Sequence, residues 1–233
     1  MRWLLSAAAV LMGLPALAQQ NDAEKLFRSM EKQVREAKGC KLVFSVNGDY
    51  GKDKKTSANG YIVVADGSKV RVELNAKYDD KEFKLQMYAD GKLMTTLFNG
   101  KAGGDPAPAE PGMTDVIAQI TARGGIFIGM ESDLAPAEKA KFDIDKYLPA
   151  SDFKLGKKIL VNGQETQPVS CTVKPQKGPA LQMTVWLVTK TNLPLKRELT
   201  ATEKDFTLTV VEMYSEFTLN PKVDAKIFEI PKK

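Results

Sequence analysis

The stretch NGYIVVADGSKVRVELN, residues 59–75, decides the fold. Two runs rich in β-branched residues flank Asp66-Gly67, a dipeptide typical of tight hairpin turns. Side chains of an extended chain alternate between two faces, so Arg71 and Glu73 lie opposite the apolar residues of 70–74. The stretch predicts two antiparallel strands. It leaves open whether Arg71 faces solvent or an apolar interior.

The same arrangement recurs along most of the chain. Asp90-Gly91 and Asn162-Gly163 are further hairpin signals, and turns are also expected near 191–192 and near 203–204. The runs between these turns amount to about nine to eleven strands. Because a large twisted sheet curls on itself, the sequence predicts a mainly β fold with helical insertions, built on one strongly curved antiparallel sheet.

A helix should precede the strands. Residues 21–39 carry apolar side chains at helical spacing, so they predict an amphipathic helix that docks on a core. Asn21 or Asp22 can cap its start, and Gly39 can end it.

A second interruption divides the strands into two groups. Residues 101–112 are rich in Gly, Pro and Ala and predict a flexible loop, and residues 113–148 predict a helical insertion. Gly124-Gly125 would weaken or end the helix within it. The apolar side chains of this insertion must be buried or cover an apolar surface: Val116, Ile117, Ile120, Ile126 and Phe127.

The N-terminus predicts export. A positively charged start, the apolar run Leu4 to Leu14 and the small-residue motif at 16–18 are typical of a cleavable signal peptide over residues 1–18. An uncleaved membrane anchor is the alternative, although the apolar run is short for a membrane span. Residues 19–233 then form one exported domain.

Composition excludes several classes of protein. The 233 residues include 34 Lys and Arg, 29 Asp and Glu, and no His, with a formal net charge of +5. This small, dispersed excess does not indicate nucleic-acid binding, although it permits attraction to anionic membranes. The lack of His removes Ser-His and Cys-His nucleophiles and His-containing zinc sites, and no phosphate-binding loop is present. We expect a binding protein without catalytic residues, cofactor or metal.

The two cysteines, Cys40 and Cys171, both fall on the apolar side of their strands. In an oxidising compartment they could form a disulfide, provided that their Cα atoms lie within about 7 Å. Two buried free thiols are the equally open alternative.

Three regions together resemble the periplasmic outer-membrane lipoprotein carriers (LolA/LolB-like). The first pairs the opening stretch with YADGKLMTTLFNG (88–100), the second is VWLVTKTNLPLKREL (185–199), and the third is YSEFTLNPKVDAKIFEIPKK (214–233). The absence of a lipid-attachment cysteine after the signal resembles the soluble carrier. One departure is that the family's Pro-x-x-Phe-Arg-Trp strand appears here as DGSKVRV.

The resemblance implies a half-barrel with an N-terminal helix, a helical lid and an apolar cavity. It implies a monomeric carrier of an acylated lipoprotein or lipid, which receives cargo from an inner-membrane donor complex and passes it to an outer-membrane acceptor. A sensor or structural module of the same fold, with a filled core and a protein partner, is the alternative.

The resemblance also assigns roles to residues. Arg71 would latch the lid by donating hydrogen bonds to backbone carbonyls of 113–130, whereas alternation alone places it on the convex face. Other apolar residues could form the cavity wall or simply the core: Leu42, Phe44, Val72, Leu85, Met87, Leu97, Met183 and Trp186.

Overall fold

The computed structural model describes residues 14–51, 54–66, 68–110, 112–131, 142–176, 178–203 and 206–231. The strands are β1 (Gly39–Asp49), β2 (Lys55–Ala65), β3 (Lys69–Tyr78), β4 (Lys81–Asp90), β5 (Leu93–Phe98), β6 (Lys101–Ala102), β7 (Ala107–Pro108), β8 (Ala150–Leu155), β9 (Ile159–Val161), β10 (Gln164–Val173), β11 (Leu181–Val188), β12 (Pro194–Glu203) and β13 (Phe206–Leu219).

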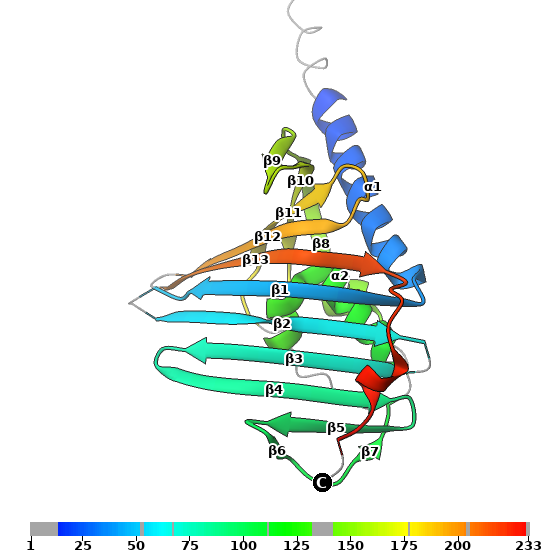
Figure 1. Ribbon diagram of the computed structural model, residues 1–233. Coiled ribbons are helices and arrows are strands. Elements are labelled where there is room, and N and C mark those ends of the chain that lie inside the picture. The colour runs from blue at the N-terminus through cyan, green and yellow to red at the C-terminus, as the bar shows by residue number, and fades with distance from the viewer. Residues whose placement is uncertain are drawn as a thin grey trace, which may run out of the picture.

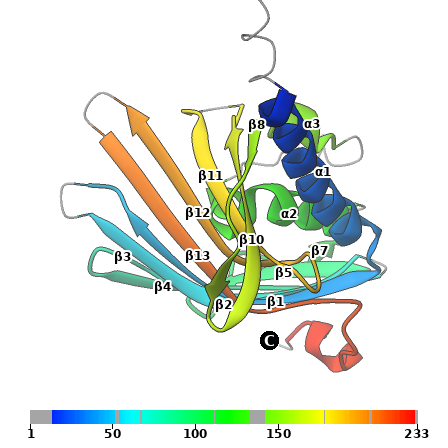
Figure 2. The same cartoon turned by 90° about the horizontal axis from the view of Figure 1, so that it is seen from above.

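All of these strands belong to one antiparallel sheet of 13 strands, ordered β6-β5-β4-β3-β2-β1-β13-β12-β11-β10-β8, with β7 beside β5 and β9 beside β10. The sheet curves strongly, and its two ends do not pair with each other (Figure 1; Figure 2). The predicted fold class, a mainly β incomplete barrel with helical insertions, is confirmed.

The helices lie on different sides of this sheet. They are α1 (Leu14–Glu36), α2 (Met113–Glu131), α3 (Ile144–Tyr147) and the short 3₁₀ helix η2 (Ala225–Phe228). Figure 2 shows α2 inside the curve of the sheet and α1 across its open side, where α1 contacts β8, β10 and α2. Helix η2 packs on the convex side against β3 and β4.

The strand registers fix which residues share a face. Leu74 of β3 lies opposite Gly60 of β2 and Leu85 of β4, and these positions point into the curve. Arg71 lies opposite Val63 and Tyr88, on the convex face. Residues directly opposite each other in a sheet point the same way, so the concave face is built from the apolar half of each alternating run.

The turns follow the sequence signals. Asn162 and Gly163 both have positive φ, 48° and 76°, as a two-residue hairpin turn requires. Gly91 follows β4 with a φ of 100°, and Asn192 turns between β11 and β12 with a φ of 56°. Gly67, Lys204 and Asp205 lie outside the described residues, but the pairing of the strands around them confirms both hairpins.

Two boundaries differ from the predictions. Helix α1 begins at Leu14 and continues past Asn21 and Asp22, so neither residue caps its start. The expected loop 101–112 contains the two short strands β6 and β7, which pair with β5. Residues 1–13 of the predicted signal peptide lie outside the described residues.

Candidate functional site

Helix α2 fills the concave face with apolar side chains. Val116, Ile120, Ile126 and Phe127 are buried, and Ile117 is half-buried. These five predicted lid residues therefore lie on one segment that packs against the inside of the sheet. We call residues 113–131 the lid helix.

The lid helix is broken by a kink at Gly125. This glycine has φ 85° and ψ −168°, far from helical values, and it separates two helical halves. A φ in this region strongly favours glycine. A Cβ at this position would also collide with Oε2 of Glu212 and Nη1 of Arg197. The expectation that Gly124-Gly125 interrupts the helix is confirmed, and the kink lies directly over two charged groups.

Arg197 of β12 holds the end of the first half. Its Nη1 donates to the carbonyl of Thr121 at 3.2 Å, and its Nη2 donates to the carbonyl of Ala122 at 2.9 Å. The last four carbonyls of a helix have no partner within the helix and carry partial negative charge. A guanidinium is therefore matched to this end both as a donor and as a cation.

Glu212 of β13 holds the start of the second half. Its Oε1 accepts from the N–H of Phe127 at 2.7 Å, and its Oε2 accepts from the N–H of Ile126 at 3.2 Å. These N–H groups are unpartnered within the helix and carry partial positive charge, so they suit a carboxylate.

The two charges also contact each other. Arg197 Nη1 lies 3.5 Å from Glu212 Oε2, and both side chains are 0% exposed. Tyr214 lies between them: it accepts a hydrogen bond from Arg197 Nη1 at 2.7 Å and donates its hydroxyl to Glu212. Burial, together with the adjacent Glu212 charge, raises the pKa of Tyr214 well above its usual value, so its proton is retained. We call Arg197, Glu212 and Tyr214 the clamp.

A second charged cluster fastens the lid helix from its other side. The buried Arg123 donates to both carboxylate oxygens of Glu31 on α1, and to the Asp145 carboxylate at 2.7 Å. It also donates to the carbonyls of Ile144 and Leu148, each at 3.1 Å. The lid helix is thereby tied to α1 and to the α3 region.

The predicted lining residues divide between the two faces. Concave positions hold Leu42, Phe44, Val72, Leu85, Met87 and Met183. Leu97 lies opposite the polar Gln86, and Trp186 lies under the ammonium of Lys196 at 4.3 Å, so both are on the convex face. The lining prediction is wrong for these two residues, because apolar character alone does not fix which way a strand residue points.

Arg71 does not latch the lid helix. Its guanidinium donates to Glu73 at 2.8 Å and to the carbonyl of Val72 at 2.9 Å, and it stacks 3.8 Å from the ring centre of Tyr88. These partners belong to β3 and β4, on the convex side where η2 packs. The latch prediction for Arg71 is therefore wrong, and the alternative convex placement holds. Arg71 is nevertheless buried rather than solvated.

Part of the concave face extends beyond the lid helix. Toward the β4–β5 end, Leu85 and Met87 are half-buried, and Phe83 stacks on Phe98 with ring centres 5.7 Å apart. Phe98 is 53% exposed. Ile117 of the lid helix is also half-buried.

The cysteines do not form a disulfide. Cys40 and Cys171 are both free and buried, so of the two alternatives the pair of thiols is found. Burial raises the pKa of each thiol to about 12, which keeps both protonated and unreactive.

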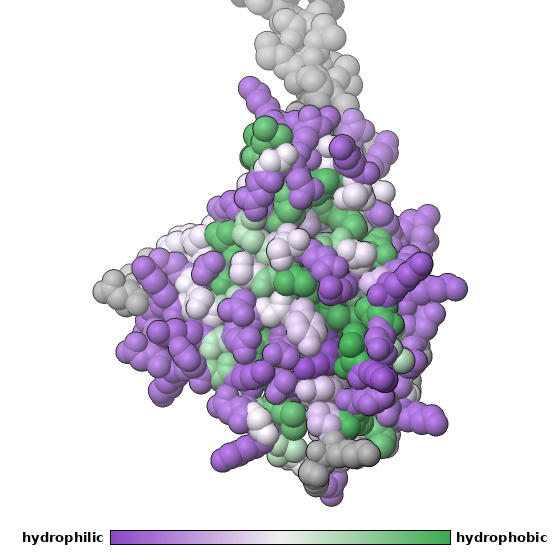
Figure 3. Space-filling model, in the orientation of Figure 1, coloured by the Kyte–Doolittle hydropathy of each residue, from purple (hydrophilic) through white to green (hydrophobic). Residues whose placement is uncertain are grey.

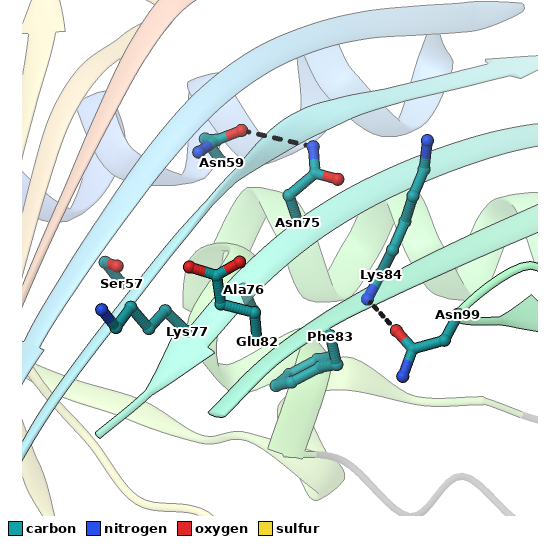
Figure 4. A pocket seen from close by; sticks show the side chains of 9 residues that line it. All are labelled: Ser57, Asn59, Asn75, Ala76, Lys77, Glu82, Phe83, Lys84 and Asn99. Carbon is teal, nitrogen blue, oxygen red and sulfur yellow. Dashed lines mark hydrogen bonds between the residues drawn. The ribbon is translucent and has the colours of Figure 1, made fainter. Parts of the chain in front are cut away.

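The convex face differs in character. Figure 3 views this face, where hydrophilic residues predominate and hydrophobic ones gather mainly in the middle. A pocket of about 470 Å³ there is lined largely by polar side chains, including Asn59, Asn75 and Lys84 (Figure 4). Among the described residues, no group of three His, Cys, Asp or Glu residues could hold a metal ion. No described helix has the length and apolar character to cross a membrane.

Comparison with known proteins supports the fold. No protein-family model and no curated protein sequence matches the chain. The structure is similar to LprF from Mycobacterium bovis, with a TM-score of 0.50, 14% identity, and coverage of 87% of this chain and 95% of LprF. The lipoprotein LppX from Mycobacterium tuberculosis has a TM-score of 0.43 at 13% identity, covering 91% of this chain and 97% of LppX. A LolA superfamily protein from Nitrosomonas europaea has a TM-score of 0.33 at 9% identity, covering 87% and 97%.

At these identities the likeness concerns architecture. The chain shares the fold of LprF. The clamp residues Arg197 and Glu212 and the tie residue Arg123 were not among the predicted site residues. A signal for two of them was present, because Arg197 and Glu212 occupy apolar positions of alternating strands.

Proposed function

We propose that this chain is a periplasmic carrier. In this proposal residues 19–233 act as one domain that shields the acyl chains of a lipoprotein or lipid against the concave face, on the way to the outer membrane. An inner-membrane donor complex would supply the cargo, and an outer-membrane acceptor would take it. The single observation that carries the proposal is an apolar helix that lies inside the sheet and whose kink is bound by four hydrogen bonds to the clamp.

The cargo would displace the lid helix. The helix packs against strands that carry apolar side chains, including Leu42 and Phe44 of β1, and an acyl chain could cover these equally well. When the helix leaves, Ile120, Ile126 and Phe127 lose their burial, and the acyl chain replaces them on the sheet. Because one apolar surface exchanges for another, the concave face stays dry in both states.

The energies of the two states are of the same order. Four hydrogen bonds join the clamp to the lid helix, and bonds to charged groups are worth about 1.5–3 kcal/mol each. Burying an acyl chain with about fifteen methylenes is worth roughly 12 kcal/mol, at about 0.8 kcal/mol for each methylene. Because the Arg123 contacts and the burial of the apolar side chains of the lid helix also favour the closed state, more than one acyl chain would be needed to open the lid.

One detail favours a lid that opens. Arg197 Nε is buried and has no hydrogen-bond partner among the described residues. A buried unsatisfied donor costs about 1–3 kcal/mol. The closed state carries this cost, and hydration of Arg197 in an open state would relieve it.

The test uses a fluorescent fatty acid and two matched substitutions. Met87→Glu places a charge on the concave face, and Leu97→Glu places the same charge on the convex face, so the second variant is the control. We expect Met87→Glu to weaken probe binding at least about tenfold, because a buried charge opposes acyl contact, and Leu97→Glu to change it less than about twofold. Equal effects of the two substitutions, or no binding by the unmodified protein, would exclude the carrier and favour a partner-binding module.

Lipid bound by the protein in its own cell gives an independent measurement. Native mass spectrometry of protein recovered from the periplasm should show an added mass in the range of a lipid or an acylated peptide. A single species at the mass of the processed chain would count against an acyl cargo.

A further inference from the structure

The most exposed large apolar side chain of the described residues, Leu160, lies on β9 and not on the strands that the lid helix covers. Leu160 is 71% exposed and its neighbour Ile159 is 46% exposed, and both belong to β9. Strand β9 is a three-residue strand that pairs only with β10 among the described strands, through the tight turn at Asn162-Gly163. We call residues 157–165 the tip hairpin.

The tip hairpin is held firmly at its base. Thr166 is buried and donates its hydroxyl to the carbonyl of Ile159 at 2.9 Å. The side chain of Gln167 donates to the carbonyl of Gly156 at 2.6 Å. The neighbouring β11–β12 turn joins it, because the N–H of Thr189 donates to the carbonyl of Glu165 at 3.0 Å. The apolar side chains at the tip are therefore presented on a fixed support.

Basic side chains surround these apolar ones. Lys157 and Lys158 directly precede Ile159, and Lys190 lies in the β11–β12 turn that contacts the hairpin. The acidic group facing them is Glu165, which pairs with Lys158 at 3.2 Å. Within the described residues no ion pair joins Lys157 or Lys190 to a carboxylate, so the tip carries net positive charge.

Exposed apolar residues next to lysines fit the surface of a bilayer. Leu and Ile side chains gain by leaving water for the boundary between headgroups and acyl chains, and nearby lysines are attracted to anionic headgroups. Lysine also protects edge strands from pairing with other chains. That protective role explains the charge, but it does not require that Leu160, the most exposed large apolar side chain, point into solvent.

The position of the hairpin supports the same partner. Figure 1 places β9 at the end of the molecule where the chain enters α1, and Figure 3 shows hydrophobic atoms gathered there. An apolar tip at one end of the molecule can meet a flat surface such as a membrane.

We propose that the tip hairpin docks the protein onto anionic membrane surfaces, with Ile159 and Leu160 entering the headgroup region and Lys157 and Lys190 contacting the headgroups. This surface is separate from the concave face, so docking does not depend on the proposed acyl cargo.

The test places a reporter on the hairpin itself. In Gln164→Cys, an environment-sensitive dye on the new thiol sits opposite Val161, and the two natural thiols are buried. A dye at Lys81→Cys, at the start of β4 beside the β3–β4 turn, is the reference. The proteins are mixed with phosphatidylcholine vesicles that contain or lack phosphatidylglycerol.

We expect a blue shift of the dye at position 164 on anionic vesicles, weaker at high salt, and none at position 81. Adding Ile159→Ser and Leu160→Ser should lower the binding responsible for this shift at least about tenfold. Phe98→Ser removes an exposed apolar side chain elsewhere and should leave the shift unchanged. It should instead weaken fatty-acid binding, which the hairpin substitutions should not affect.

Two results would overturn docking. One is a dye at position 164 that stays in water on anionic vesicles, even if the protein binds them through its N-terminus. The other is an equal shift with and without Ile159 and Leu160. Self-association that the serine substitutions abolish, without any shift on vesicles, would assign the tip to pairing between copies of the chain and would also overturn the proposal.

Discussion

Replacing Glu212 with glutamine tests the clamp with almost no change in side-chain shape. In the closed structure its carboxylate accepts from the backbone N–H groups of Ile126 and Phe127 and lies beside Arg197. The amide keeps one oxygen for these donors but loses the charge, and its NH₂ group must face groups that are themselves donors. The closed state therefore loses bonds at the lid and leaves Arg197 without a buried counter-charge.

The magnitude follows from the burial of the pair. Removing one partner of a fully buried ion pair costs about 3–5 kcal/mol. Most of this cost should fall on the closed state, because water can hydrate Arg197 once the lid helix has left. A change of about 3 kcal/mol moves the equilibrium between closed and open lid by roughly a hundredfold.

Hydrogen exchange of residues 113–131 measures this equilibrium directly. Glu212→Gln should speed exchange of these amides by roughly a hundredfold relative to the unmodified protein. Apparent affinity for a fluorescent fatty acid should rise by up to the same factor, because it scales with the populated open fraction. Glu216→Gln is the control: it lies on the same strand, half-exposed on the convex face, and pairs with Lys41 at 2.8 Å. Such a pair contributes about 0–1 kcal/mol.

Equal exchange of the lid helix in Glu212→Gln and Glu216→Gln, with both proteins folded, would refute this reasoning. A second result would refute it in another way. Glu212→Gln could lower the free energy of unfolding in urea by the whole of about 3–5 kcal/mol, while exchange of the lid helix still requires global unfolding. The clamp would then stabilise the whole fold and would not set the equilibrium between closed and open lid.

Four further predictions follow from the same contacts. Gly125→Ala should also speed exchange of the lid helix, because alanine is strained at a φ of 85° and its Cβ would collide with the clamp. Arg123→Met should lower the free energy of unfolding in urea by about 3–5 kcal/mol, because Glu31 is left without its main partner. Burial alone raises the pKa of Asp145, but Arg123 and Arg28 outweigh it and the pKa is lowered. Its contribution is therefore present at neutral pH, and exchange near α3 should rise as the pH falls from about 5 toward 2. Arg71→Leu should leave fatty-acid affinity within about twofold, because its contacts are on the convex face.

Each of these four predictions has a control variant or an outcome that would contradict it. Gly104→Ala has open space around its Cβ and should leave lid exchange unchanged. Arg28→Met removes a one-third exposed arginine and should cost less than Arg123→Met. In Asp145→Asn the acid response near α3 should be flatter, and an unchanged response would place its origin elsewhere. A large change in fatty-acid affinity on Arg71→Leu would restore a role for that residue in cargo binding.

The sheet could be predicted because its signals are local. Strand alternation and turn dipeptides such as Asn162-Gly163 act within a few residues, and the strand pairing follows them. The burial of the apolar side chains in residues 113–131 was also predictable, since an apolar helical stretch must find an apolar surface. The extension of α1 to Leu14 was missed, because a capping residue such as Asp22 allows a helix to begin without requiring it.

The direction in which a strand residue points was harder to predict. The latch role was assigned to Arg71 from the family resemblance. The alternation of side chains along β3 had placed Arg71 on the convex face, where it pairs with Glu73. Leu97 and Trp186 were assigned to the cavity because they are apolar, but cross-strand neighbours place them outside. Register between strands decides such cases, and register depends on turns and bulges that a single strand does not contain.

The two charged residues of the clamp could have been identified from the alternation of apolar and polar side chains along their strands. Arg197 stands between Leu195 and Leu199, and Glu212 between Val210 and Tyr214, each at a position where the alternation requires an apolar side chain. An isolated buried charge is costly, so one charged residue in such a position demands a partner inside the fold. Two such residues of opposite charge, on the two strands of a hairpin, are therefore expected to pair with each other. The kinked helix then supplies the remaining partners, because a helix interrupted inside an apolar cavity exposes carbonyls on one side of the break and N–H groups on the other. The break at Gly125 and the buried pair beneath it each leave polar groups that water cannot reach, and each satisfies the groups of the other.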